Sequence, residues 1–214
     1  MILVIYDIMH TESKGIQSSL TAPRVLALGI VVGSALISLL MIILGQAVGK
    51  GIESVMIIHD YYIVLAIMSG AGFIGLLVFG SGQIGQQIQH SRDATNMLKI
   101  LALTAVASAF LIEITGTIGY IEYRLPDPDS AKSKILEIFP FAHEPMFEVM
   151  EYVGLVGVIW TGLIAYFTWH FRERMFADIG VRNAMIMMIS LAIIYALVVS
   201  LMGIVPTKIA SVQG

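Results

Sequence analysis

The chain has 214 residues, of which 57% are hydrophobic and 13% are charged, and its mean hydropathy is +0.88. Soluble domains carry about 25% charged residues, so this composition indicates a polytopic membrane protein. The net charge of −3 is small and no block of basic residues occurs, which argues against a nucleic-acid partner. The chain contains no cysteine, which excludes disulfides, thiolate metal sites, iron–sulfur clusters and covalently attached c-type haem.

The sequence predicts an N-terminal tail over residues 1–22 and a single transmembrane domain over residues 23–210. Stretches of about 20 apolar residues are long enough to cross the hydrocarbon core of a bilayer. Five such stretches occur, at residues 25–49, 60–89, 96–123, 146–170 and 184–205. The predicted fold class is therefore an all-α integral membrane protein, a bundle of five transmembrane helices.

The longest polar connection, residues 125–140, separates the third and fourth predicted helices. Two prolines interrupt its first part, whereas residues 131–138 have the pattern of a short amphipathic helix lying on the membrane surface. Glu144 followed by Pro145 is typical of a helix N-cap with proline at the first helical position. We therefore expect the fourth helix to begin there.

The distribution of basic residues predicts the orientation, because cytoplasmic segments of membrane proteins carry an excess of Lys and Arg. With the N-terminus inside, the inner segments carry Lys14, Arg24, Arg92, Lys99, Arg172, Arg174 and Arg182. The outer segments carry Lys50, Arg124, Lys132, Lys134 and Lys208. The excess on the inner side favours an internal N-terminus and an external C-terminus.

Four histidines fall at the ends of the second and fourth predicted helices. His59 and His143 lie at the outer ends, and His90 and His170 lie near the inner ends. Facing imidazoles can ligate a b-type haem or another transition metal. The two histidines of each helix are roughly 40 to 46 Å apart along it at 1.5 Å per residue, which places them at the membrane interfaces. There they are better explained as amphipathic interfacial side chains.

Glu113 is the one acidic residue near the middle of a predicted span, away from the ends of the span. A charged side chain within lipid costs on the order of 2.5 to 3.5 kcal/mol on insertion scales, so it needs a partner or a role. At helical spacing, Glu113 shares a face with Thr117, Tyr120 and Arg124. We expect Glu113 to face the interior of the bundle, either protonated or paired with a cation.

Acidic residues also follow the start of the fourth helix. Glu144, Glu148 and Glu151 share one helix face and place negative charge near the positive end of the helix dipole. Together with Glu113, the carboxylates of Glu148 and Glu151 are candidate ligands for a divalent metal or members of a proton relay. Capping and solvation of the helix end explain them as well, above all Glu144.

One resemblance covers the third and fourth helices. The third helix ends in Gly116, Tyr120, Tyr123 and Arg124 in a G-x-x-x-Y-x-x-Y-R pattern, and the fourth begins with an F-E-x-x-E pattern at residues 147–151. This arrangement resembles a group of small prokaryotic polytopic membrane proteins. The resemblance implies the same architecture and a prokaryotic plasma membrane, and it implies no particular activity. In that group a histidine often follows the second glutamate, where this chain has tyrosine.

Three hypotheses for function follow from these residues. The first is a small accessory subunit of a membrane complex, for example a respiratory or oxidative one, without catalytic activity of its own. Its partners would be lipid and either other subunits or a second copy of itself. The second is an electron carrier that binds b-type haem or a metal through His59 and His143. The third is a small transporter or proton path around Glu113.

Overall fold

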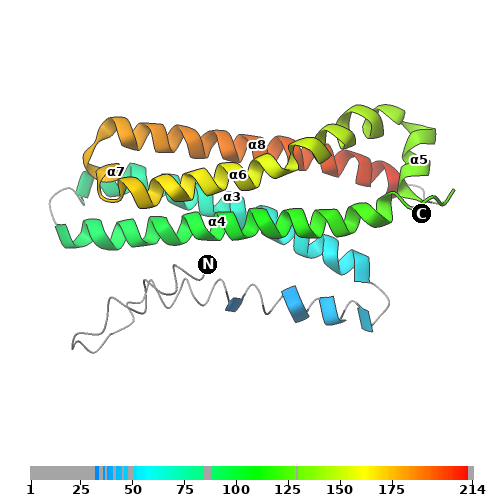
Figure 1. The fold of residues 1–214 in the computed structure, drawn as a ribbon, viewed down its shortest axis with the longest axis horizontal. Helices are drawn as coiled ribbons and strands as arrows, with labels where there is room; N and C mark the ends of the chain where they lie inside the picture. The colour runs from blue at the N-terminus through cyan, green and yellow to red at the C-terminus, as the bar shows by residue number, and fades with distance from the viewer. Residues whose placement is uncertain are drawn as a thin grey trace. The chain divides into compact units, whose positions relative to one another are not determined.

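The computed structural model describes separate residues between 32 and 47, and then residues 51–83, 88–128 and 130–211 (Figure 1). All regular structure in these ranges is helical, which confirms the predicted all-α class. The chain divides into two compact units, Met1–Leu36 and Ile37–Gly214, and the fold described below belongs to the second unit. The predicted tail and most of the first predicted span lie outside the described residues, and the described residues of that span are helical.

Four described helices are long and apolar enough to cross a membrane. Helix α3 covers Gly51–Gln83, α4 covers Ile88–Tyr123, α6 covers Glu148–Phe171 and α8 covers Ile179–Ser211. They coincide with the second to fifth predicted spans, although α3 begins nine residues before the predicted start at residue 60. His59 consequently lies within a helix and not at its mouth. The apolar spans themselves are Ser54–Gly80, Arg92–Ile121, Ala142–Phe171 and Ile179–Ile204.

The connection between α4 and α6 contains two short helical segments. Helix α5, Ala131–Ile138, is the predicted amphipathic helix, and the side chain of Ser130 caps its N-terminus by accepting a hydrogen bond from Ser133 N. A π-helical segment, η2, covers Ala142–Phe147 and continues directly into α6. The predicted helix start at Glu144-Pro145 is therefore wrong. The wide π turn explains this difference. Pro145 has no N–H to donate, and the backbone hydrogen bond from Glu148 N–H to the carbonyl oxygen of His143 spans it.

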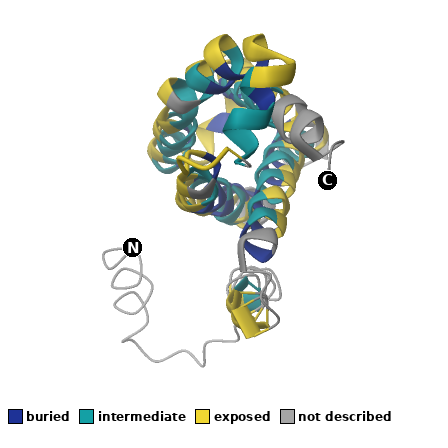
Figure 2. Cartoon of the chain, turned by 90° about the vertical axis from the view of Figure 1, so that its right-hand side faces the viewer, coloured by how far each residue is buried: buried dark blue, intermediate teal, exposed yellow. Residues whose placement is uncertain are grey.

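The four long helices form a ring in which each contacts two neighbours (Figure 2). Helix α4 packs between α3 and α6, and α8 packs between α6 and α3. Helix α5 and η2 contact α8 at one end of this ring, whereas the short helix α7, Arg174–Ala177, contacts the start of α8 at the other. We call these ends the α5 end and the α7 end, and the adjoining parts of the bundle the α5 half and the α7 half.

The main apolar core lies in the α7 half. It consists of Phe73, Leu77, Ala94, Leu98, Ala102, Ile164, Met175, Phe176, Met185 and Ile189. A second, smaller cluster lies at the α5 end and consists of Tyr123, Ile135, Ala142 and Phe147. The outward faces of the long helices carry exposed leucine, isoleucine, valine and methionine, as expected where lipid is the surrounding solvent. The interior of this bundle therefore changes character along its axis.

Candidate functional site

His59 joins α3 to α4. Its Nδ1 is 3.1 Å from the carbonyl oxygen of Ile112 and 3.1 Å from Oγ1 of Thr115. Because a carbonyl oxygen only accepts, Nδ1 carries the hydrogen in the bond to Ile112, and Nε2 of the neutral ring keeps its lone pair. The ring lies against Gly116, where an added Cβ would be 3.2 Å from His59 Cε1. The imidazole thus connects two helices and retains one nitrogen that could accept a proton or ligate a metal.

Glu113 reaches from α4 to α6. An ideal Cβ on Gly154 would lie 2.9 Å from Oε1 and 3.0 Å from Oε2 of Glu113, so the carboxylate occupies the space that a side chain would fill. The side chain of Glu113 is half-buried there. Within the described part of the chain, this carboxylate has no hydrogen-bond or ion-pair partner. Glu113 is therefore a polar group inside an apolar span, held against the backbone of its neighbour.

The predicted companions of Glu113 on its own helix make other contacts. Thr117 donates its hydroxyl hydrogen to the backbone carbonyl of Glu113 at 2.8 Å, as threonines in membrane helices commonly do. Tyr120 stacks on Phe147, with ring centroids 5.9 Å apart. The guanidinium of Arg124 lies 4.8 Å from the centroid of Tyr120 in a cation–π contact. Because each of these residues contacts a different partner, they do not form one site together with Glu113.

Tyr195 lies next to this carboxylate and was not identified from the sequence. Its hydroxyl on α8 donates a short hydrogen bond to the carbonyl oxygen of Val153 on α6. Its ring lies against Gly157, where an added Cβ would be 3.4 Å from Cε1. A lone tyrosine within an otherwise apolar span is the signal that could have found it. Glu113 from α4 and Tyr195 from α8 therefore both pack against one stretch of α6, residues 153–157.

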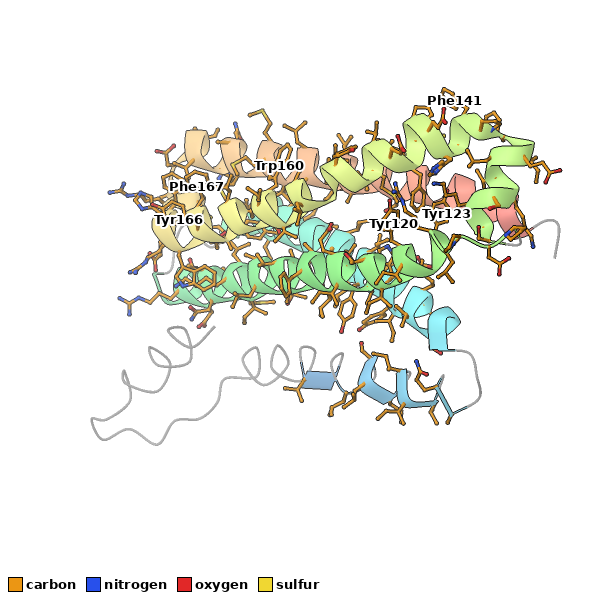
Figure 3. All side chains as sticks on the ribbon, turned by 45° about the vertical axis from the view of Figure 1, so that its right-hand side comes forward. Tyr120, Tyr123, Phe141, Trp160, Tyr166 and Phe167 are labelled. Carbon is orange, nitrogen blue, oxygen red and sulfur yellow. The ribbon has the colours of Figure 1, made fainter. Side chains whose placement is uncertain are left out.

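His143 belongs to the aromatic cluster at the α5 end. Its side chain is 3% exposed, and its Nδ1 forms a 2.8 Å hydrogen bond with the hydroxyl of Tyr123. The Tyr123 ring stacks on Phe147 at 4.3 Å between centroids and on Tyr120 at 6.1 Å. Tyr120 and Tyr123 project from the last turns of α4 toward the α5 end, far from Tyr166 and Phe167 (Figure 3). The contact fastens η2 to the end of α4.

The remaining candidate residues lie apart from these contacts or outside the described side chains. His170 is exposed and stacks on Tyr166, with ring centroids 6.0 Å apart. The side chains of His90 and Glu151 are not among those described. Among the described side chains, no group of three His, Asp or Glu residues is arranged to hold a metal ion. Metal binding through Glu113, Glu148 and Glu151 stays a prediction.

Comparisons with family models, with curated proteins and with solved structures found no match to this chain. Among the described residues of the α5 half are an imidazole whose Nε2 has no partner there, a carboxylate without a partner there, and a tyrosine bound to a backbone carbonyl. These groups can bind a polar group of another helix, exchange a proton, or hold a ligand at its edge.

Proposed function

We propose that this chain is a small subunit of a membrane protein complex, with a packing role and no catalytic activity of its own. A helix of another membrane subunit, or of a second copy of this chain, lies against the α5 half of α6 in that complex. The observation that carries the proposal is Tyr152, which is 84% exposed on the outward face of α6.

The position of Tyr152 makes this exposure informative. It lies about 15 Å along the helix from Ala142, the first residue of the apolar span, at 1.5 Å per residue. Within the described residues its hydroxyl has no hydrogen-bond partner, although a phenol hydroxyl removed from water usually has one. A polar side chain of a partner helix would satisfy it. Glu113 lies against the same stretch of α6 and supplies a second polar group for such a contact.

Purification in a mild detergent tests the proposal. We expect a second protein, or a second copy of this chain, to co-purify in fixed stoichiometry. The variant Tyr152→Ala should weaken that association. Tyr166→Ala is the matched control, because Tyr166 is also an exposed tyrosine of α6, at 61%, but lies in the α7 half. A stable species with the 23.3 kDa mass of one chain, in both detergent and lipid nanodiscs, would overturn the proposal.

The proposed location is the plasma membrane of a prokaryote, with the N-terminus inside, the C-terminus outside and the α7 end toward the cytoplasm. Support comes from the described basic residues of the α7 end, namely Arg92, Lys99, Arg172, Arg174 and Arg182. Cysteines introduced at Ser130 and Ser211 should both react with an impermeant thiol reagent from outside the cell. A cysteine introduced at Glu173 should react only after the membrane is opened. Reaction of Ser130→Cys and Ser211→Cys from opposite sides would contradict this topology.

A second candidate function is a proton path through Glu113. The observation that favours it is a carboxylate inside an apolar span that has no hydrogen-bond or ion-pair partner among the described residues. The Tyr195 hydroxyl is bonded to the neighbouring turn of α6. Proteoliposomes containing the chain and a pH-sensitive dye provide the test. A proton flux that Glu113→Gln abolishes would favour this function over the packing role, and wild-type vesicles as tight as empty ones would exclude it.

A third candidate, binding of b-type haem or a metal, is favoured by one feature of His59. A ligating histidine commonly donates its other ring N–H to a carbonyl or carboxylate, and His59 Nδ1 has this bond to Ile112. His143 is the other predicted ligand, and its Nδ1 is bound to Tyr123. A visible spectrum and a metal analysis of the purified protein decide this. A Soret band that is lost in His59→Ala would establish haem binding, and a colourless, metal-free protein would exclude it.

A further inference from the structure

A polar hollow lies at the α7 end, where α6 leaves its apolar span. It has a volume of about 470 Å³ and is lined by Trp169, His170, Phe171, Arg172, Glu173 and Arg174. This volume falls within the range of small-molecule sites, roughly 300 to 1,000 Å³. Nitrogen-tipped side chains gather at this end of the bundle, beyond Tyr166 and Phe167 (Figure 3). The hollow combines two aromatic rings with cationic side chains at the membrane boundary.

The backbone at this turn has an unusual conformation. Arg172 ends α6 with φ of 48°, and it is the one non-glycine residue with positive φ among the described residues. Residues with side chains rarely adopt such a conformation, and it persists only where the surroundings hold it. Here the residues that follow stabilise the conformation, because Met175 is 0% exposed and Phe176 is buried with it in the main core. The Arg172 Nε donates to the carbonyl oxygen of Trp169 at 3.2 Å. The turn is therefore anchored, and it presents the arginines at a fixed place.

The charges around the hollow favour an anion. Arg172 and Arg174 are exposed, and neither forms an ion pair with an acidic side chain within the described part of the chain, although Glu173 lies between them. The Lys99 ammonium lies 5.7 Å from the centre of the Trp169 ring. Guanidinium groups bind phosphate through paired hydrogen bonds, and tryptophan prefers the level of lipid headgroups. The lining of the hollow thus includes both apolar aromatic rings and cationic side chains.

We propose that this hollow binds the phosphate of an anionic phospholipid headgroup, with Arg172 and Arg174 on the phosphate and Trp169 beside the glycerol region. A free phosphate compound shares the same chemistry. The lipid is the proposed source, because the hollow adjoins the end of an apolar span and is bordered by Trp169 and Phe171. This site lies in the α7 half and does not depend on the partner proposed for the α5 half.

Native mass spectrometry of the detergent-solubilised protein with added dioleoyl phosphatidylglycerol tests the site. Because hydrogen bonds from the guanidinium groups to the phosphate are lost, the variant Arg172→Gln/Arg174→Gln should bind this lipid at least about tenfold more weakly. Arg172→Lys/Arg174→Lys should recover part of the loss. The matched control is Lys132→Gln/Lys134→Gln, which removes two cations from the α5 end and should leave binding unchanged.

Three results would overturn the proposal. One is equal binding of phosphatidylglycerol and phosphatidylcholine with the same acyl chains, since the net charge of the headgroup would then be irrelevant. Another is an equal loss in the control variant, since overall charge and not the hollow would then govern binding. The third is full displacement of the lipid by millimolar glycerol 3-phosphate, which would assign the site to a soluble phosphate. Circular dichroism of each variant verifies that the helices are intact.

Discussion

The two halves of the bundle are built from different contacts. In the α7 half, large apolar side chains from several helices interdigitate around Leu77, Leu98 and Met185, all of them almost fully buried. In the α5 half, polar side chains cross between helices and lie against glycine. His59 lies against Gly116 and Glu113 lies against Gly154. The α7 half is stabilised by close packing of apolar side chains. The α5 half is stabilised by polar contacts between helices, which need glycine on the neighbouring helix to leave room for the side chain.

This difference matters because lipid chains are as apolar as leucine. Burial of an apolar side chain between membrane helices therefore gains packing, but little of the hydrophobic free energy available in water. A hydrogen bond across helices contributes about 0.6 kcal/mol on average in a membrane protein. We infer that the α7 half responds mainly to changes of volume. The α5 half should respond to changes of polarity and to any side chain added at a glycine.

The largest effect is expected from a cavity in the α7 half. Leu98→Ala should lower the free energy of unfolding by about 2 kcal/mol, at the low end of the range for buried leucines in soluble proteins because lipid also solvates leucine. Leu98 is 0% exposed, whereas Leu155 on α6 is 64% exposed and provides the matched control. Reversible unfolding in mixed micelles measures both variants. Equal losses for Leu98→Ala and Leu155→Ala would contradict the proposed core.

A methyl group at Gly154 should give the next largest effect. Gly154→Ala places a Cβ within 3.0 Å of both Glu113 oxygens, and the carboxylate has to swing away at a cost of about 1 kcal/mol. The cost should fall to nearly zero when Glu113→Ala is already present, which a double-mutant cycle measures directly. Gly162→Ala is the control, because nothing lies within 4 Å of its added Cβ. Additive effects of the two substitutions would show that these residues do not touch.

Two substitutions of Glu113 distinguish the role of its charge from the role of its size. Glu113→Gln keeps the size of the side chain and should unfold within about 0.5 kcal/mol of wild type, the usual range for substitutions that break no specific contact. Glu113→Ala empties the space against Gly154 and should impair stability or assembly more. If Gln folds normally but loses a proton flux, a bound metal or a partner, the ionised carboxylate has a functional role. If both variants match wild type in stability, assembly and ligand content, Glu113 is merely tolerated.

A comparably small effect is expected at the α5 end. Tyr123→Phe removes the hydroxyl that is bonded to His143 Nδ1 and keeps the stacked ring, so it should cost about 0.6 kcal/mol. Hydrogen exchange over residues 139–147 should rise at the same time, because this bond fastens η2 to α4. Tyr166→Phe, on the exposed face of the α7 half, should change neither quantity. If Tyr123→Phe left the free energy of unfolding and the hydrogen exchange unchanged, the bond to His143 would not stabilise the α5 end.

The sequence predicted the elements of this fold better than it predicted their contacts. Four spans and helix α5 follow from the length of apolar stretches and from one amphipathic pattern, which are local properties. The start of the fourth helix was wrong because a π turn around Pro145 depends on how η2 packs at the α5 end. The local preference of proline for the first turn of a helix does not predict such packing.

The candidate site was predicted only in part, for a similar reason. Glu113 and His59 stood out as polar residues at apolar helices, and both contact neighbouring helices. Their partners could not be predicted, because Gly154 and Gly116 are identified only by the register between helices. The bond from Tyr195 to Val153 joins residues 42 positions apart and depends on the same register. A single sequence contains no direct signal for it.

Site-specific photo-cross-linking tests the central claim most directly, since it asks which half of α6 contacts a partner. A photoreactive residue replaces either Tyr152 or Tyr166, two exposed tyrosines on the same helix. We expect a discrete cross-linked protein band from position 152 in intact membranes, and only lipid adducts from position 166. Lipid adducts alone from both positions, or a protein band from position 166 alone, would contradict a partner at the α5 half.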